Sequence, residues 1–258
     1  MVNQIKTALI DIDGTVYFKG ALIPGVKEAI DELRTANLHL RFLTNSDSRS
    51  GAQLAERIAE MGLTLDPSEI YTAADAASTY TGQAHKTCFC LMPERLHSLF
   101  NHAPTDAPSV DYVVLGDQST VATYDQLNQA FRYIRAGAEL VVMQKGQFYI
   151  TEDGENLDTG AFATLLEYAS GTVATVVGKP SARFFHGVLA ELGVSPEETI
   201  VVGDDIYSDV VGAKTIGATS ILVRTGKYAE QRAAIDETQI DYEIDSLADL
   251  PELLARLS

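Results

Sequence analysis

Two carboxylates lie two residues apart at the end of the first apolar run of the chain. The run Thr7-Ala8-Leu9-Ile10 leads directly into Asp11-Ile12-Asp13-Gly14-Thr15. In open α/β sheets, ligands bind in the crevice beyond the carboxyl ends of the strands, so acids placed there face a site and not the core. We interpret Asp11 and Asp13 as catalytic. The alternative is a polar turn, because Asp-Gly is a common turn pair.

Three later segments place further polar residues after predicted strands. These residues are Thr44 and Asn45, then Lys179, then Asp204 and Asp205, with Asp209 one helical turn further on. Each segment has an ordinary alternative: a helix cap for Thr44-Asn45-Ser46, a solvated loop for Lys179 and a turn for Gly203-Asp204-Asp205. Their order and their common position after strands favour a single site.

The combined residue types indicate phosphoryl transfer. Packed carboxylates raise one another's pKa unless cations neutralise them. Lys179 supplies one positive charge, and Mg²⁺, which prefers oxygen ligands and bridges carboxylates to phosphates, is the predicted second. Asp11 could then attack phosphorus and form an aspartyl-phosphate, while Asp13, which points the same way along an extended segment, transfers the proton. Thr44 and Lys179 would hold the phosphoryl oxygens.

Alternating strands and helices must position these residues. The apolar pattern predicts strands over 5–10 and 38–43, an amphipathic helix that begins near Pro24-Gly25-Val26, and a second helix over 50–61. This βαβα order implies a parallel sheet. Strands are expected again over 199–202 and 219–223, with helices over 182–192, 210–216 and from Leu247 onward.

The middle third of the chain reads as a small α/β unit of its own. Strands are expected over 87–91, 110–115, 139–143, 147–151 and 173–177, with helices over 123–136 and 158–169 and a turn over 153–156. Alternation along the first of these strands places Cys88 and Cys90 on one face. We predict that both are core residues and that neither binds metal.

Composition limits the partners and the location. Lys and Arg number 19 against 36 Asp and Glu, a formal net charge of -17, which argues against a nucleic-acid or anionic-membrane surface. The first strand begins within a few residues of Met1, which leaves no room for a signal peptide, and no apolar run reaches membrane-spanning length. We therefore predict a soluble cytoplasmic protein.

The four segments resemble, in order, the four motifs of the haloacid dehalogenase superfamily of phosphatases. Asp11-Ile12-Asp13-Gly14-Thr15 is similar to the first motif, Thr44 to the second, Lys179 to the third, and Gly203-Asp204-Asp205 with Asp209 to the fourth. The resemblance implies that Mg²⁺ is held by Asp11, by the backbone carbonyl of Asp13 and by Asp204, with Asp205 and Asp209 supporting these ligands. It also places Thr44, Asn45 and Lys179 on the phosphate.

The long insertion before Lys179 and the phrase Val177-Gly178-Lys179-Pro180-Ser181 are similar to the subfamily with a large α/β cap (C2 type, subfamily IIA). That subfamily includes the phospholysine phosphohistidine inorganic pyrophosphate phosphatases and the N-acetylglucosamine-operon phosphatases. The implied α/β fold has a Rossmann-like parallel-sheet core domain, 1–77 and 178–258, and an inserted smaller α/β cap domain, 78–177. Thr159 and Gly160 correspond by position to a cap segment that faces the substrate.

The resemblance narrows the reaction but leaves the substrate open. Asp13 argues against dehalogenase and phosphonatase chemistry, because neither needs this acid/base, and mutases carry a smaller helical cap elsewhere. We predict a Mg²⁺-dependent phosphatase of a small phosphorylated metabolite. Sugar phosphates, nucleotides, pyridoxal phosphate and pyrophosphate are equally compatible. The alternative is a catalytically weak regulatory or interaction protein, against which the intact acid pair argues. A homodimer formed through the cap stays open, because no sequence feature supports it.

Overall fold

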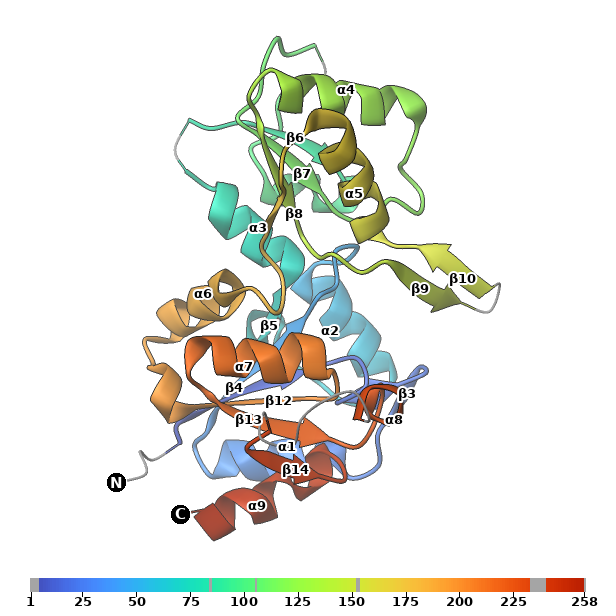
Figure 1. Cartoon of the computed structure of the whole chain (residues 1–258). Helices are drawn as coiled ribbons and strands as arrows, with labels where there is room; N and C mark the ends of the chain where they lie inside the picture. Colours follow the sequence, from blue (N-terminus) through green and yellow to red (C-terminus); the bar gives the residue numbers. More distant parts are fainter. Residues whose placement is uncertain (1–4, 84, 105, 152–153, 233–239, 258) are drawn as a thin grey trace. The chain divides into compact units, whose positions relative to one another are not determined.

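The computed structural model describes residues 5–83, 85–104, 106–151, 154–232 and 240–257 (Figure 1). The chain packs as two compact units. The first comprises Met1–Thr44, Gly51–Tyr71 and Lys179–Ser258, and the second comprises Asn45–Ser50 and Thr72–Gly178. Packing into units does not test which segments fold as domains, so the predicted division into 1–77 with 178–258 and 78–177 stays a prediction.

A six-stranded sheet forms the centre of the first unit, in the order β14-β13-β12-β1-β4-β5. Its strands are β1 (Thr7–Asp11), β4 (His39–Thr44), β5 (Ile70–Thr72), β12 (Thr199–Gly203), β13 (Thr219–Val223) and β14 (Tyr242–Ile244). From β1 the chain continues to β4 on one side and returns later to β12 on the other. In open α/β sheets, ligands bind beyond the carboxyl ends of the strands at such a reversal of strand order.

The strands and helices of this unit follow from their apolar patterns. All five residues of β1 are buried, as expected for a parallel strand covered on both faces. Helix α1 (Val26–Thr35) buries Val26, Ala29, Ile30 and Leu33, which is the spacing that the sequence predicted. The other helices of this unit are α2 (Gly51–Glu60), α6 (Ala182–Leu192), α7 (Val211–Ile216), α8 (Tyr228–Gln231) and α9 (Leu250–Leu257).

Several short elements complete the first unit. They are the hairpin β2 (Tyr17–Phe18) and β3 (Ala21–Leu22), the 3₁₀ turns η1 (Pro67–Glu69), η3 (Pro196–Glu198) and η7 (Leu247–Asp249), and the π-helical turn η4 (Ile206–Val210). The sequence did not predict β5 or β14, which are only three residues long. Such short strands carry too little periodicity to be recognised.

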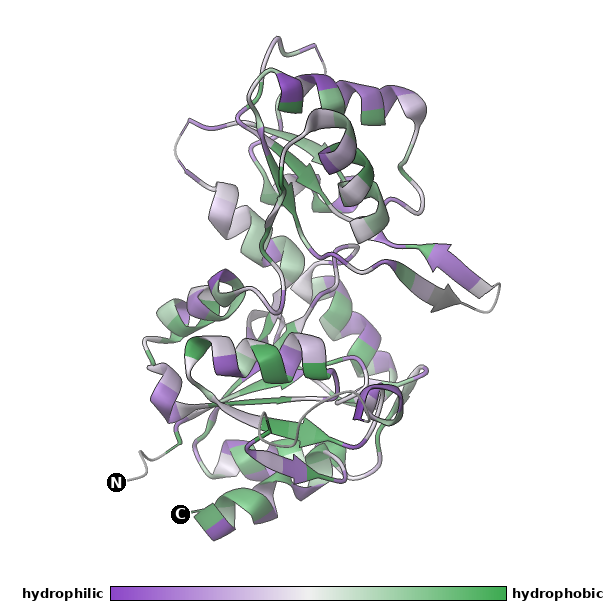
Figure 2. Ribbon diagram, in the orientation of Figure 1, coloured by the Kyte–Doolittle hydropathy of each residue, from purple (hydrophilic) through white to green (hydrophobic). Residues whose placement is uncertain are grey.

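The second unit has its own parallel sheet, in the order β11-β8-β7-β6. Its strands are β6 (Cys88–Leu91), β7 (Tyr112–Leu115), β8 (Glu139–Val142) and β11 (Thr175–Val176), and its helices are α3 (Ala73–Thr81), α4 (Tyr124–Arg135) and α5 (Thr159–Ser170), with the 3₁₀ segment η2 (Glu94–Leu99). Figure 2 shows hydrophobic residues concentrated on the strands of both sheets. The predicted α/β class, a parallel core sheet with an inserted smaller α/β unit, is thus confirmed.

Two details of the second unit bear on the predictions. Cys88 and Cys90 are buried free thiols, as predicted for core residues. The turn predicted over 153–156 is wrong for 154–156, and Asp153 lies outside the described residues. Residues Gly154–Leu157 form strand β10, which pairs with β9 (Phe148–Thr151), because an exposed edge hairpin accepts the Gly and Asn that suggested a turn. None of the described helices has the length and apolar character needed to span a bilayer.

Candidate active site

The ends of three adjacent strands bring the predicted residues together in the first unit. Asp11 is the last residue of β1, Thr44 is the last residue of β4, and Asp204 directly follows β12. The register pairs Asp11 with Leu43 and Ile10 with Val202, so the three strands end at the same level. A parallel sheet therefore places these residues at one edge, as the sequence predicted.

The Asp11 carboxylate is buried and held through both of its oxygens. Lys179 Nζ lies 2.5 Å from Oδ1, and Thr15 Oγ1 donates to Oδ2 at 3.1 Å. Charge-assisted hydrogen bonds of this kind are stronger than neutral ones and fix the orientation of the acceptor. The side chain is therefore held in one orientation at the carboxyl end of β1.

Lys179 connects Asp11 with Asp209. Its ammonium group is buried and also donates to Asp209 Oδ1 at 2.7 Å. Burial alone would lower the pKa of Lys179, but Asp11 and Asp209 together raise it above its usual range. The lysine is therefore a fixed positive charge among the acids, and its loss would leave buried carboxylates without their partner.

Asp209 reaches this position from the π-helical turn η4. Asp205 caps the turn, since its side chain accepts hydrogen bonds from the backbone N–H groups of Tyr207 and Ser208. The backbone N–H of Asp205 in turn donates to Asp209 Oδ2 at 3.3 Å. Single π-helical turns occur frequently at functional sites, where they redirect a side chain. Here the turn directs Asp209 toward Lys179.

Two glycines make room for the Asp204 carboxylate. A Cβ at Gly14 would lie 2.3 Å from Asp204 Oδ2, and a Cβ at Gly226 would lie 2.0 Å from the same oxygen. Both glycines have positive φ angles, +93° and +54°, which further disfavours other residues. The backbone N–H of Lys227 donates to Asp204 Oδ2 at 2.7 Å. The carboxylate therefore occupies a cradle formed by two loops.

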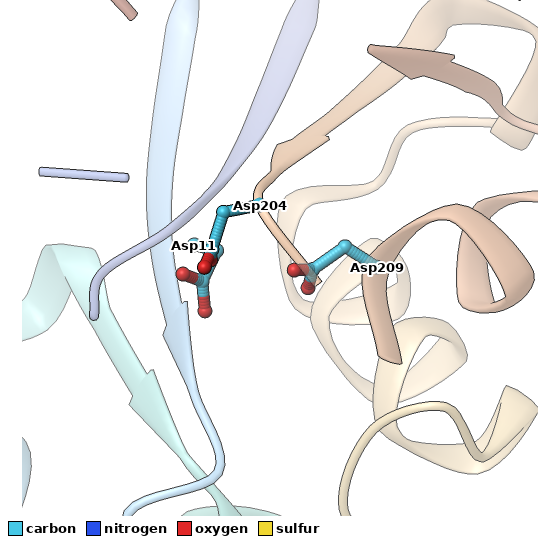
Figure 3. Close-up of side chains that lie close together, drawn as sticks. All are labelled: Asp11, Asp204 and Asp209. Atoms are coloured by element: carbon cyan, nitrogen blue, oxygen red, sulfur yellow. The ribbon is translucent and has the colours of Figure 1, made fainter. Parts of the chain in front are cut away.

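Asp11, Asp204 and Asp209 form an acidic cluster that fits a cation (Figure 3). One oxygen from each residue lies within 4.8 Å of the others. Burial, followed by repulsion from Asp11 and the other acid of the cluster, raises the pKa of Asp204 to about 8. Burial also raises the pKa of Asp209 to about 7 against the opposing effect of Lys179. A bound divalent cation would relieve this repulsion, and oxygen donors suit Mg²⁺.

Asp13 lies beside the cluster with its side chain exposed to solvent. Partial desolvation raises the pKa of Asp13, a hydrogen bond with Tyr17 lowers it, and the neighbouring Asp11 raises it again, so that the pKa lies above the usual value. A raised pKa favours the protonated carboxyl that a general acid needs. Tyr17 is buried, and Arg57 lies over its ring at 5.8 Å from the centroid.

The remaining predicted residues fall in different places. Thr44 is buried at the end of β4, whereas Asn45 belongs to the second unit. Asp205 faces Lys227, whose Nζ lies 2.7 Å from Oδ2, and this ion pair lowers the pKa of Asp205 although burial opposes it. Thr159 and Gly160 begin α5 in the second unit. The roles predicted for all of these residues toward phosphate, substrate and metal stay predictions.

Sequence reasoning missed Gly226, which makes room for the Asp204 carboxylate, Lys227, whose backbone N–H donates to it, and the contact between Tyr17 and Asp13. A signal for the first two existed, because Gly226 and Lys227 follow β13 as Asp204 follows β12. The same rule about strand ends would have included them. No comparable signal marks Tyr17, because its ring and hydroxyl reach the site through the hairpin of β2 and β3.

Comparison with known proteins identifies the family. A model of haloacid dehalogenase-like hydrolases matches residues 8–104, and a second model of hydrolases of this type matches residues 176–250. The chain is 39% identical over 239 residues to bovine (Bos taurus) haloacid dehalogenase-like hydrolase domain-containing protein 2, covering 93% of this chain and 90% of the relative. The chain belongs to the haloacid dehalogenase-like hydrolase family.

Two further similarities agree with the resemblance drawn from the motifs. Human (Homo sapiens) phospholysine phosphohistidine inorganic pyrophosphate phosphatase is 32% identical over 256 residues, which cover 97% of this chain and 94% of that protein. The structure of a glycerol phosphate phosphatase from Mycobacterium tuberculosis in complex with magnesium superimposes with a TM-score of 0.85 at 26% identity, covering 98% of this chain and 79% of that one. The predicted relationship to phosphatases with a large α/β cap is thus confirmed.

Proposed function

We propose that this protein is a Mg²⁺-dependent phosphatase that hydrolyses a small phosphate ester through an aspartyl-phosphate on Asp11. The observation that supports this most directly is the fixed Asp11 carboxylate, held by Lys179 at 2.5 Å and Thr15 at 3.1 Å within an acidic cluster at the strand ends. The relatives named as phosphatases support the same reaction.

In the first half of the reaction, an oxygen of Asp11 attacks phosphorus. The Asp11 oxygen–phosphorus bond forms while the bond between phosphorus and the leaving oxygen breaks, and Asp13 gives its proton to that oxygen. The raised pKa of Asp13 keeps a proton available for this step. Lys179 would offset negative charge on the phosphoryl group, and Thr44, the last residue of β4, would contact the same group.

In the second half, water attacks phosphorus and Asp11 leaves as a free carboxylate. Asp13, now ionised, accepts the proton of the attacking water, which restores both acids to their starting states. The contact with Tyr17 holds the Asp13 carboxyl between these two steps. Asp13 therefore serves in turn as acid and as base.

Asp11, Asp204 and Asp209 each offer a carboxylate oxygen to Mg²⁺. The family resemblance adds the backbone carbonyl of Asp13 as a further ligand. When bound, Mg²⁺ would offset the charge of the acids and of the phosphate and polarise the phosphoryl oxygens. The absence of a side chain at Gly14 and Gly226 supports this assignment, because it leaves space for the charged Asp204 carboxylate at a buried position.

Hydrolysis of para-nitrophenyl phosphate tests the proposal. The purified protein should release nitrophenol with Mg²⁺ and lose this activity in excess EDTA, with recovery when Mg²⁺ is restored. Asp13→Asn should reduce turnover by at least roughly 100-fold, as expected for a lost general acid/base. Asp31→Asn, the same chemical change on an exposed residue of α1, is the matched control. Absence of metal-dependent release at high enzyme concentration would refute the proposal.

A further inference from the structure

A buried carboxylate lies outside the catalytic cluster, three residues after Thr44. Asp47 is 8% exposed and belongs to the segment Asn45–Ser50, which packs in the second unit. Its Oδ2 accepts a hydrogen bond from Thr159 Oγ1 at 2.6 Å and another from Gln144 Nε2 at 3.2 Å. The chain thus leaves the catalytic strand β4 and at once enters a polar network of the other unit.

The segment around Asp47 occupies the carboxyl ends of the strands of the second sheet. The backbone N–H of Asp117, just beyond β7, lies 3.4 Å from the Asp47 carbonyl oxygen. Arg95, beyond β6, donates to the Ser48 carbonyl oxygen at 2.6 Å, and Gln144 lies beyond β8. A Cβ at Gly116 would lie 2.9 Å from the Asp47 carbonyl oxygen. In an open α/β sheet this is the position of a ligand, and here the chain itself fills it.

The same network fixes the start of α5. The Gln144 amide donates to Asp47 and, at 2.6 Å, to Asp158 Oδ1. Asp158 in turn accepts from the backbone N–H of Thr159 at 2.8 Å and caps the helix. The Thr159 side chain is 1% exposed, and its hydroxyl proton is donated to Asp47. Backbone and side chain of Thr159 are therefore both held by acids, Asp158 for one and Asp47 for the other.

Gly178, the last residue of the second unit, packs beside Asn45, the residue with which the chain first enters that unit. A Cβ at Gly178 would lie 2.2 Å from the Met143 carbonyl oxygen and 2.7 Å from Asn45 Oδ1. Asn45 directly follows Thr44, and Gly178 directly precedes Lys179. The chain neighbours of Thr44 and Lys179, the two residues proposed to hold the phosphoryl group, thus pack against each other and against Met143, which precedes Gln144.

The surroundings of Asp47 do not favour an ionised acid. Burial raises the pKa of Asp47 to about 7, and Asp158 and Asp117 act in the same direction, against the hydrogen bonds from Thr159 and Gln144. An amide side chain would keep a hydrogen-bond acceptor here without the cost of burying a charge. Buried ionisable residues that lower stability occur more often at functional positions than elsewhere in proteins.

We propose that Asp47 is a positioning residue for the start of α5. Through its hydrogen bonds with Thr159 and Gln144 it fixes the first residues of α5 relative to the segment that follows Thr44. This position would determine which leaving groups the enzyme accepts. The inference rests on the proposed phosphatase function. The first residues of α5 correspond to the predicted substrate-facing segment. Their displacement should affect substrates with a large leaving group more than those with a small one.

Two substrates of different size test this inference. Asp47→Ala should reduce kcat/KM for para-nitrophenyl phosphate by about 10- to 100-fold, the loss typical of a misplaced binding segment. For acetyl phosphate, whose leaving group is small, the loss should be no more than about threefold. Asp47→Asn keeps an oxygen that accepts from Thr159 and should recover much of the loss. Asp117→Ala, on the adjoining loop, should leave the ratio of the two kcat/KM values unchanged.

A double-mutant cycle separates positioning from direct contact. Thr159→Val removes the hydroxyl without changing the shape of the side chain. If Asp47 acts through Thr159, the double variant Asp47→Ala, Thr159→Val should be no worse than the poorer single variant. The inference would be overturned if the losses of kcat/KM in the two single variants multiplied in the double variant. It would also be overturned if the ratio of kcat/KM for the two substrates stayed within about twofold of wild type in both single variants. Failure of the wild-type enzyme to hydrolyse either substrate would instead refute the proposed function.

Discussion

Asp11→Asn removes one negative charge from the acidic cluster and the nucleophile from the reaction, while the size of the side chain is kept. In the proposed mechanism the Asp11 oxygen forms the bond to phosphorus, and an amide cannot replace it. Turnover of para-nitrophenyl phosphate should therefore fall by at least roughly 1,000-fold. The effect on stability is the sharper part of the prediction, because two large electrostatic changes oppose each other.

The structure gives the size of both changes at pH 8.5, above the pKa values of about 8 for Asp204 and about 7 for Asp209. The Asp11, Asp204 and Asp209 oxygens lie within 4.8 Å of one another, and repulsion at that distance is about 3.5 kcal/mol per pair at an effective dielectric constant of about 20. The substitution relieves two such repulsions. It also removes the attraction to Lys179 at 2.5 Å, about 7 kcal/mol on the same scale. The two effects nearly cancel.

In Mg²⁺-free buffer, the melting temperature of Asp11→Asn should therefore lie within about 4 °C of that of wild type, or above it. Saturating Mg²⁺ should raise the melting temperature of wild type by about 5 to 10 °C, the effect of a ligand at 100 times its dissociation constant, and should raise that of Asp11→Asn far less. Differential scanning fluorimetry across a Mg²⁺ titration measures both quantities, with Asp31→Asn as the control.

Three results would contradict this prediction. A loss of more than about 10 °C without Mg²⁺ would mean that Asp11 supports the fold and that the repulsion is not relieved. A Mg²⁺-dependent shift equal to that of wild type would mean that Asp11 is not a ligand. Retained turnover in a variant that melts normally would remove Asp11 from the reaction altogether.

Three further predictions follow from the site and from the second unit. Gly14→Ala should reduce Mg²⁺-dependent activity at least roughly tenfold, because its Cβ would lie 2.3 Å from an oxygen of Asp204, whereas Gly20→Ala, at a similar positive φ angle with open space around it, should not. Lys179→Met should lower kcat by roughly 100- to 1,000-fold and reduce the melting temperature in Mg²⁺-free buffer, since it leaves buried acids unpaired. The melting temperature of Asp47→Asn relative to wild type should increase from pH 5 to pH 8. The folded-state pKa of about 7 exceeds the unfolded value, so wild type, but not the amide, loses stability as pH rises through this range.

The core fold was predictable because its strands are long, apolar and buried on both faces. β1 shows all five of its residues buried, and such runs alternating with amphipathic helices permit only a parallel sheet. Strand β10 and the strands β5 and β14 were not predictable from the same signals. They are short or exposed, so tertiary pairing and not local pattern determines them.

The candidate site was predictable to the extent that it depends on strand ends. Asp11, Thr44 and Asp204 follow apolar runs, and a parallel sheet brings such ends to one edge whatever the loops between them do. Residue types then indicated phosphoryl transfer, because acids, a hydroxyl and a lysine at one edge suit a phosphate and a divalent cation.

Tertiary structure alone decided which residues support those side chains. The π-helical turn brings Asp209 to Lys179, the loop after β13 places Lys227 against Asp204, and the segment after β4 enters the other unit so that Asp47 meets Thr159. The last pair is separated by 112 residues in the chain. Hydrogen bonds between distant segments depend on how whole elements pack, and no local pattern of residues encodes them. The amino-acid sequence thus determined the residue types of the candidate site and their edge of the sheet, and packing determined their partners.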